Sequence, residues 1–228
     1  MKIAIIDSGI NAAHPHVRAI AGGIGVAPEG LHPWGFHEDT RDRLGHGTAV
    51  AGIIREKVPQ ADLFAVKVIG RRLSTGIDVM VRALDWCRYH RMDLVSLSVE
   101  MEDPDQSAAL ESAIAGLLVV SAARQLPGCL PGVIAVDADD ECPRDEFRYR
   151  GGVFYASPYA RPAAGSAHTE SRGDMGFTVA NMTGFVARVL PSVGATPERA
   201  GQTWHDSIAA LRDNLVWELA SIGERWKF

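Results

Sequence analysis

The chain has 228 residues, of which 46% are hydrophobic and 22% charged, and its net charge is −5. A chain of this length and ordinary globular composition buries roughly 70% of its unfolded surface, so it needs no disulfide or metal to fold. The acidic balance argues against a nucleic acid or an anionic membrane as partner. Apolar runs also stay well short of the roughly 18 residues of a membrane span.

Three cysteines, Cys87, Cys129 and Cys142, are odd in number and lack the spacing of metal ligands. They are therefore expected to be free thiols in a reducing compartment. Asp7 follows the initiating methionine too closely for a signal peptide. We accordingly expect a cytoplasmic protein with no cofactor and no metal centre.

Strands and helices are expected to alternate along most of the chain. In order, short apolar runs predict strands and amphipathic stretches predict helices: a strand over Lys2–Ile6, a helix over Thr48–Glu56, a strand over Asp62–Val68, a helix over Ser74–Arg91, a strand over Asp93–Val99, a helix over Gln106–Ala115, and strands over Leu117–Ala122 and Gly132–Asp137. Residues 141–174 are rich in loops, with short extended pieces such as Val153–Ala156, and an apolar helix follows over Phe177–Leu190. This alternation predicts a parallel sheet covered on both faces.

The C-terminal segment, residues 191–228, is expected to be a helical extension of a domain over residues 1–190. Thr196 and Pro197 form a typical helix start. Apolar side chains then recur at three- and four-residue spacing: Trp204, Ile208, Leu211, Leu215 and Leu219. This stripe either packs on its own domain or binds a partner helix.

Three motifs follow one another in a fixed order. Asp7-Ser8-Gly9 ends the first strand, Gly45-His46-Gly47-Thr48 opens a helix, and Gly176 to Gly184 lie at the start of the last apolar helix. In this order, and together with the strand Leu94–Ser98, they resemble the subtilisin-like serine peptidases (family S8) over about residues 1–190. The resemblance implies a three-layer α/β fold, a mostly parallel sheet between helices.

The resemblance also implies roles for two residues. Asp7 would be the buried carboxylate that orients the catalytic histidine and stabilises its charged form. His46 would be the general base that deprotonates the nucleophile.

The nucleophile position is occupied by glycine. In the family a serine precedes a helix glycine by eight residues, and counting back from Gly184 gives Gly176. The competing register puts Thr178 at the nucleophile but leaves Phe185 where the close-packed helix glycine belongs. We therefore favour Gly176. Glycine at a helix start costs only a few tenths of a kcal/mol against serine, so the fold can persist while the chemistry is lost.

The oxyanion-binding stretch is altered as well. The family uses a side-chain amide after a buried strand, and the corresponding residues are Ala122, Ala123, Arg124 and Gln125. Gln125 keeps a carboxamide but is one methylene longer, and Arg124 replaces a glycine. In subtilisin itself, loss of one such donor costs about 10²–10³ in rate and loss of the nucleophile about 10⁶.

The family binds extended peptide along an edge that corresponds here to Ser98, Val99 and Glu100. Glu100 brings a charged side chain to an edge where the family has glycine. It either selects a basic peptide or protects an edge strand from pairing.

The function expected from these features is that of an inactive or strongly impaired subtilisin-like peptidase that binds a peptide or protein partner. One alternative is an active hydrolase that uses Thr178 or a water activated by His46. Another is a scaffold subunit of a peptide-maturation assembly that engages a partner enzyme through its C-terminal helix.

Overall fold

The computed structural model describes residues 1–28, 35–70, 75–161, 173–193 and 204–224. Within these ranges, a single sheet has the strand order β3-β2-β4-β1-β5-β6-β7-β9-β8. The strands are β1 (Lys2–Asp7), β2 (Gly22–Val26), β3 (Phe36–His37), β4 (Asp62–Lys67), β5 (Leu94–Leu97), β6 (Val119–Ala122), β7 (Val133–Ala138), β8 (Phe147–Arg150) and β9 (Val153–Ala156). Neighbouring strands are parallel except β3 and β8, which pair antiparallel at the two edges.

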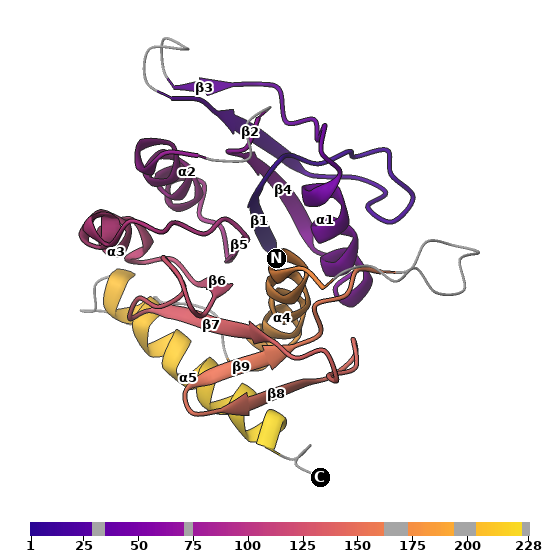
Figure 1. The fold of residues 1–228 in the computed structure, drawn as a ribbon, viewed down its shortest axis with the longest axis vertical. Helices are drawn as coiled ribbons and strands as arrows, with labels where there is room; N and C mark the ends of the chain where they lie inside the picture. The colour runs from indigo at the N-terminus through magenta and orange to yellow at the C-terminus, as the bar shows by residue number, and fades with distance from the viewer. Residues whose placement is uncertain (29–34, 71–74, 162–172, 194–203, 225–228) are drawn as a thin grey trace.

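Helices cover both faces of this sheet (Figure 1). Their bounds are α1 (His46–Lys57), α2 (Ile77–Tyr89), α3 (Ser107–Ile114), α4 (Met175–Val189) and α5 (Trp204–Glu224), with 3₁₀ turns at Pro104–Gln106 and Leu190–Ser192. Helices α2 and α3 pack on one face, and α1, α4 and α5 pack on the other. The expected three-layer arrangement, with a mostly parallel sheet between helices, is confirmed.

The alternation of side chains along β1 divides the core into two layers. Ile3 and Ile5 face the layer of α1 and α4, whereas Ala4 and Ile6 face the layer of α2 and α3. All four are fully buried, as expected for a central parallel strand with helices on both sides. Asp7 then ends the strand at the edge of the sheet where the candidate site forms.

Strand β2 was not expected from the sequence, because three of its five residues are glycine. A Cβ built on Gly23 would contact the backbone of Ala65, with 3.0 Å to its carbonyl carbon. The glycine therefore reflects close approach of β2 to β4 rather than a loop. The low strand propensity of glycine is therefore the reason why the sequence did not predict β2, although only glycine fits at position 23.

The stretch expected to be rich in loops contains a hairpin. Strands β8 and β9 pair antiparallel on either side of Gly151 and Gly152, whose φ angles are +59° and +87°. A Gly-Gly pair between alternating apolar and polar residues is a known hairpin signal. It was present in the sequence as Phe147–Arg150 and Val153–Ala156.

Helix α5 packs against β8 and α4 (Figure 1). Leu215 and Leu219 are fully buried, in the same core cluster as Phe147. Two members of the apolar stripe thus lie on the chain's own domain. Trp217 is 71% exposed. The expected helix start at Thr196 and the side chain of Trp204 lie outside the described residues.

None of the helices described here combines the length and the apolar character that a membrane span requires.

Candidate active site

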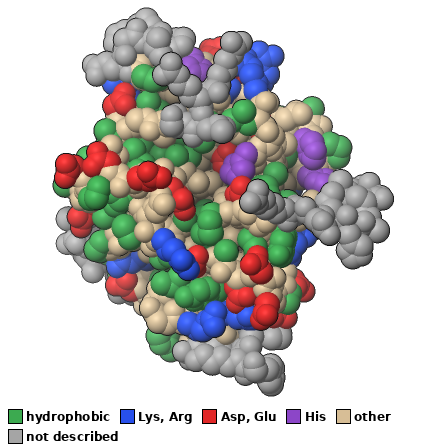
Figure 2. All heavy atoms as spheres, in the orientation of Figure 1, with side chains coloured by type: hydrophobic (Ala, Val, Ile, Leu, Met, Phe, Trp, Pro, Cys, Tyr) green, Lys and Arg blue, Asp and Glu red, His purple; other side chains and the backbone are tan. Residues whose placement is uncertain are grey.

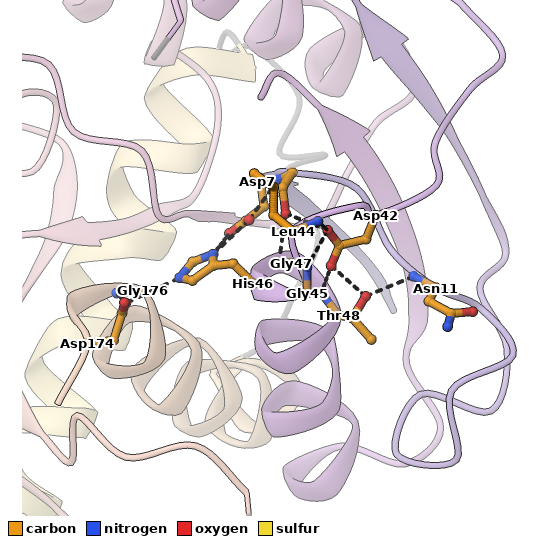
Figure 3. Close-up of polar contacts among 11 residues, drawn as sticks. Asp7, Asn11, Asp42, Leu44, Gly45, His46, Gly47, Thr48, Asp174 and Gly176 are labelled. Atoms are coloured by element: carbon orange, nitrogen blue, oxygen red, sulfur yellow. Dashed lines mark hydrogen bonds and ion pairs between the residues drawn. The ribbon is translucent and has the colours of Figure 1, made fainter. Parts of the chain in front are cut away.

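Asp7 and His46 are brought together where β1 ends and α1 begins (Figure 3). The His46 Nδ1 atom lies 2.8 Å from Asp7 Oδ1 and 2.9 Å from Oδ2. The backbone N–H of Ser8 donates to Asp7 Oδ1 over 2.7 Å. This buried carboxylate is therefore fixed from both sides and orients the imidazole.

The start of α1 is held by Asp42, a residue that the sequence analysis missed. The N-cap position is Gly45, which has no side chain to cap the helix. Asp42 supplies the missing oxygens: Oδ1 accepts from the backbone N–H groups of Leu44 and Gly45, each over 2.9 Å. Its Oδ2 accepts from the backbone and the hydroxyl of Thr48. The Asp-x-x-x-His-x-Thr spacing, with a carboxylate near a helix start, was the available signal.

Gly47 is required by the close packing of α1 on the strand end. A Cβ at this position would strike the carbonyl oxygen of Gly9 and lie 3.1 Å from Asp7 Oδ1. The glycine after His46 thus allows the helix to approach the buried carboxylate.

On the other side of His46, Gly176 occupies the first turn of α4 (Figure 3). A Cβ built on Gly176 would point at the imidazole, 2.5 Å from His46 Cε1 and closer still to Nε2. Position 176, and not Thr178, therefore faces the histidine, as the favoured register predicts.

Asp174 fills the space beside Gly176, and the sequence analysis also missed this residue. It is the N-cap of α4, and its Oδ1 accepts from the Gly176 backbone N–H over 2.7 Å. The same oxygen lies 3.2 Å from His46 Nε2. A carboxylate therefore meets the imidazole nitrogen that a serine hydroxyl would need.

His46 is thereby held between two carboxylates, one on each ring nitrogen. Burial of the ring lowers the pKa of His46, but the carboxylates of Asp174 and Asp7 outweigh burial and raise it to about 10. The hydrogen bond to His46 in turn holds the pKa of the Asp174 carboxyl below its usual range. Both ring nitrogens then donate, so the imidazole is an imidazolium at neutral pH and lacks the lone pair of a general base.

Thr178 is poorly placed to serve as a nucleophile. Its side chain is fully buried, and its hydroxyl donates to the carbonyl of Asp174 over 3.3 Å, one helical turn back. The hydroxyl is thus directed along α4 rather than toward His46. The structure argues against this alternative.

The stretch expected to correspond to the family's oxyanion site lies at the end of β6. Arg124 extends outward, with its side chain 82% exposed, and forms an ion pair of 2.7 Å with Asp137. Gln125 lines a pocket of about 400 Å³ beyond the strand end, together with Met101, Glu102, Leu126 and Cys129. Gln125 thus keeps a carboxamide at the rim of this pocket, which we call the β6 pocket.

The expected peptide edge leads from β5 into the β6 pocket. Val99 is buried, Ser98 is partly buried and Glu100 is exposed. Directly after them, the backbone N–H of Met101 donates to the carbonyl of Leu126 over 2.9 Å. The edge is therefore already paired at Met101, within the chain.

Acidic side chains gather near this edge. Partial burial and the charges of Asp174, Asp137 and Glu102 raise the pKa of Glu100. Figure 2 shows acidic side chains over the left part of the face that carries the site.

Within the described ranges, no three or more His, Cys, Asp or Glu side chains are grouped as a metal site would require.

Comparisons with known proteins agree with this geometry. The model of the subtilase family matches residues 1–147. Subtilisin Savinase of Lederbergia lenta is 34% identical over 136 residues, which cover 54% of this chain and 46% of that protein. A thermostable alkaline protease of Halalkalibacterium halodurans is 32% identical over 161 residues, which cover 61% of this chain and 42% of that protein. The chain thus spans less than half the length of these curated relatives.

Solved structures show the same fold at low sequence identity. The prenylagaramide maturation protease PagA superposes with a TM-score of 0.63 at 18% identity, covering 97% of this chain and 94% of PagA. The protease domain of PatA gives 0.62 at 21% identity, covering 84% and 79%. From its strand order, the Asp7–His46 pair and the matching family model, this chain belongs to the subtilase family.

Proposed function

We propose that this chain is a catalytically inactive subtilase homologue that binds a peptide or a protein segment in the cleft of the ancestral enzyme. The observation that carries the proposal is the contact between Asp174 Oδ1 and His46 Nε2, 3.2 Å long, beside a glycine at the nucleophile position. A serine-type mechanism needs a hydroxyl at 176 and a neutral imidazole next to it. Neither is provided.

The same contact argues against a water activated by His46. An imidazolium whose Nε2–H already donates to Asp174 cannot accept a proton from water. This contact therefore speaks against His46 as the base of a hydrolase with an unusual nucleophile.

Loss of activity is tested with a fluorophosphonate probe on four proteins. The unchanged chain should not react, because nothing at position 176 can be phosphonylated. Gly176→Ser alone should react slowly at most, since its Cβ would lie 3.0 Å from Asp174 Oδ1 and still closer to His46. Asp174→Ser with Gly176→Ser keeps a helix cap, removes the second carboxylate, and should react faster than the single variant.

The control for this series adds His46→Ala to the double variant, which should abolish the reaction. Phosphonylation of the unchanged chain, mapped by mass spectrometry to Thr178 or any other hydroxyl, would overturn the proposal. Equal reaction of the single and double variants would show that Asp174 does not hold the site in its inactive state.

Peptide binding is tested by selection from a random peptide library displayed on phage. The unchanged chain should enrich related sequences, and isothermal titration should give a dissociation constant for the synthetic peptide. Ser107→Trp, which fills the β6 pocket from the first residue of α3, is the matched control and should lose the peptide. Failure to enrich any sequence beyond this control contradicts the binding half of the proposal.

A scaffold role in a peptide-maturation assembly is the second candidate. The solved structures of similar fold include a lanthipeptide protease and the maturation protease PagA. On this chain, the surface available for such a role is the outer face of α5 at Trp217, because Leu215 and Leu219 already pack on the core.

A further inference from the structure

A second pocket, of about 480 Å³, lies on the opposite side of His46 from Asp174. In Figure 3, Asp42 and Asn11 lie in loops beside Thr48, which belongs to the first turn of α1; all three line the pocket. We call it the α1 pocket. The residues that line it include Asn11, His14, His16, Asp42, Arg43 and Arg161. Neither the Asp7–His46 pair nor the β6 pocket uses these residues.

Positive charge exceeds negative charge around the α1 pocket. Arg43 pairs with Asp39 over 2.9 Å, but Asp39 also faces Arg41 at 3.4 Å and Lys67 at 3.5 Å. One carboxylate is therefore shared by three cations.

The same surplus occurs at the other wall. Arg161 lies 3.6 Å from Glu56, whose other oxygen is bound by Arg144. Two guanidinium groups, those of Arg43 and Arg161, thus line this pocket in a protein with a net charge of −5. Such a concentration favours an anion.

Among the described residues that line the pocket, Asp42 is the one carboxylate, and its hydrogen-bonding capacity is already used. Both oxygens of Asp42 accept hydrogen bonds, from Ser8, Leu44 and Gly45 on one side and from the backbone and hydroxyl of Thr48 on the other. These bonds are internal to the start of α1. Asp42 keeps its negative charge, but Arg43 and Arg161 pair with Asp39 and Glu56 and not with this carboxylate.

Two histidines add N–H donors to this charge. The backbone N–H of His16 donates to His14 Nδ1 over 3.2 Å, so Nε2 is the ring nitrogen of His14 that stays available to a ligand. The two rings meet edge to face, 5.0 Å apart. Burial and the nearby charge of Arg161 lower the pKa of His16.

The wall that carries Arg161 is fixed by α4. Asn181, fully buried in that helix, donates to the carbonyls of Ser157 and Tyr159 over 2.9 and 3.3 Å. The backbone N–H of Asp174 donates to Pro158 over 3.0 Å. These bonds position the segment that ends at Arg161 before any ligand arrives.

We propose that the α1 pocket binds an anionic group, a carboxylate or a phosphate, between the guanidinium groups of Arg43 and Arg161 and the imidazoles of His14 and His16. Planar, charged donors of this kind suit both groups. The proposal of anion binding depends only on the residues of the α1 pocket. The further step, that the cleft prefers a peptide with an acidic group on this side of His46, rests on the proposed function.

The test titrates the full chain with inorganic phosphate and, separately, with acetate, at constant ionic strength set with sodium chloride. Ring Cε1–H signals of His14 and His16 are followed by NMR. We expect saturable shifts, with a dissociation constant about tenfold larger in Arg161→Gln, equivalent to the loss of one charged hydrogen bond. Arg150→Gln is the matched control, because Arg150 lies over Tyr155 and outside the α1 pocket, and its affinity should not change.

Shifts with phosphate alone identify a phosphate site, and shifts with acetate as well identify a carboxylate site. The absence of saturable shifts with either probe overturns the proposal, as does an equal loss of affinity in Arg161→Gln and Arg150→Gln. If Arg161→Gln does not fold, Arg43→Gln serves in its place. Phosphate binding without any selected peptide would contradict the proposed function and leave the anion site standing.

Discussion

At the scale of single residues, the site differs from a peptidase at two positions that act together. Gly176 removes the hydroxyl, and its missing Cβ also lets the imidazole of His46 lie where a side chain would otherwise stand. Asp174 then occupies the free nitrogen of that imidazole. The substitution at 176 therefore does more than delete a nucleophile, because it permits a charged contact that removes the base as well.

The first prediction concerns the charge of His46. Asp174→Asn keeps a good helix cap but removes one of the two carboxylates, so the pKa of His46 should fall from about 10 toward its ordinary value. Titration of the His46 ring signals by NMR measures it. A pKa that does not move would mean that Asp174 does not hold the proton. Asp139→Asn, away from the site beside Arg148, is the control.

The second prediction is the pH dependence that follows. Because the pKa of His46 is raised in the folded state, its bridge to Asp174 contributes fully below about pH 6.5 and is lost as the pH rises toward about 10. The pKa of Asp174 is lowered in the folded state, so the stabilisation by the bridge is fully present above about pH 4 and is lost as the carboxyl is protonated at lower pH. Asp174→Asn should thus cost about 1 kcal/mol at pH 6 and less near pH 10, as measured by urea unfolding. A difference that grows with pH would contradict the bridge.

The third prediction uses the cysteines. Cys129 is exposed and lines the β6 pocket, whereas Cys87 and Cys142 are buried. Burial raises the pKa of the Cys142 thiol to about 11 and that of Cys87 further still. One thiol per native chain should therefore react quickly with a chromogenic disulfide, and Cys129→Ser should abolish that phase. A bound peptide should slow the reaction; two fast thiols in the native chain would contradict this description.

At the scale of elements, the sequence located the central strands and helices but misplaced several helix bounds by two or three residues, and the start of α4 is the one that matters for the site. The apolar run predicted a helix from Phe177, whereas α4 begins at Met175 with Asp174 as its cap. That difference of two residues concealed the role of Asp174. The order of the motifs predicted the pairing of His46 with Asp7. It could not predict the contact between Asp174 and His46, because that contact depends on the absence of a side chain at position 176.

Other misses share a physical cause. Strand β2 and the β8–β9 hairpin depend on glycines chosen for close approach or for positive φ, which propensity treats as signals of loops. Asp42 escaped notice because it lies outside the helix that it caps, and most of its partners are backbone N–H groups. Apolar periodicity, in contrast, identified α5. Leu215 and Leu219 are buried, as the interpretation that this helix packs on its own domain requires.

The fourth prediction tests the packing of α1 on α4. A Cβ on Gly184 would lie 2.8 Å from the Cβ of Lys57, a buried residue whose Nζ donates to the carbonyl of Arg144 over 2.6 Å. Gly184→Ala should therefore destabilise the fold by about 1–3 kcal/mol through overpacking, despite the better helix propensity of alanine. Urea unfolding measures the change, with Gly70→Ala in open space as the control. A stabilised Gly184→Ala variant would show that α1 and α4 can separate at no cost.

At the scale of the whole molecule, the chain is one three-layer unit in which α5 belongs to the same core as α1 and α4. The alternative interpretation, a helix held free for a partner, conflicts with the burial of Leu215 and Leu219. What remains available on α5 is the face that carries Trp217. A role in assembly would therefore have to coexist with, and not replace, the packing of this helix on β8 and α4.

The fifth prediction separates these two faces of α5. Leu219→Ala removes a fully buried side chain and should lower the free energy of unfolding by about 2–5 kcal/mol. Trp217→Ala removes a side chain that is 71% exposed and should change it by no more than about 0.5 kcal/mol. Urea unfolding of both variants, followed by circular dichroism, makes the comparison. A neutral Leu219→Ala would mean that α5 is not part of the cooperative unit. That result would conflict with the close packing of α5 on β8, where a Cβ built on Gly223 would lie 3.2 Å from Phe147 Cε2.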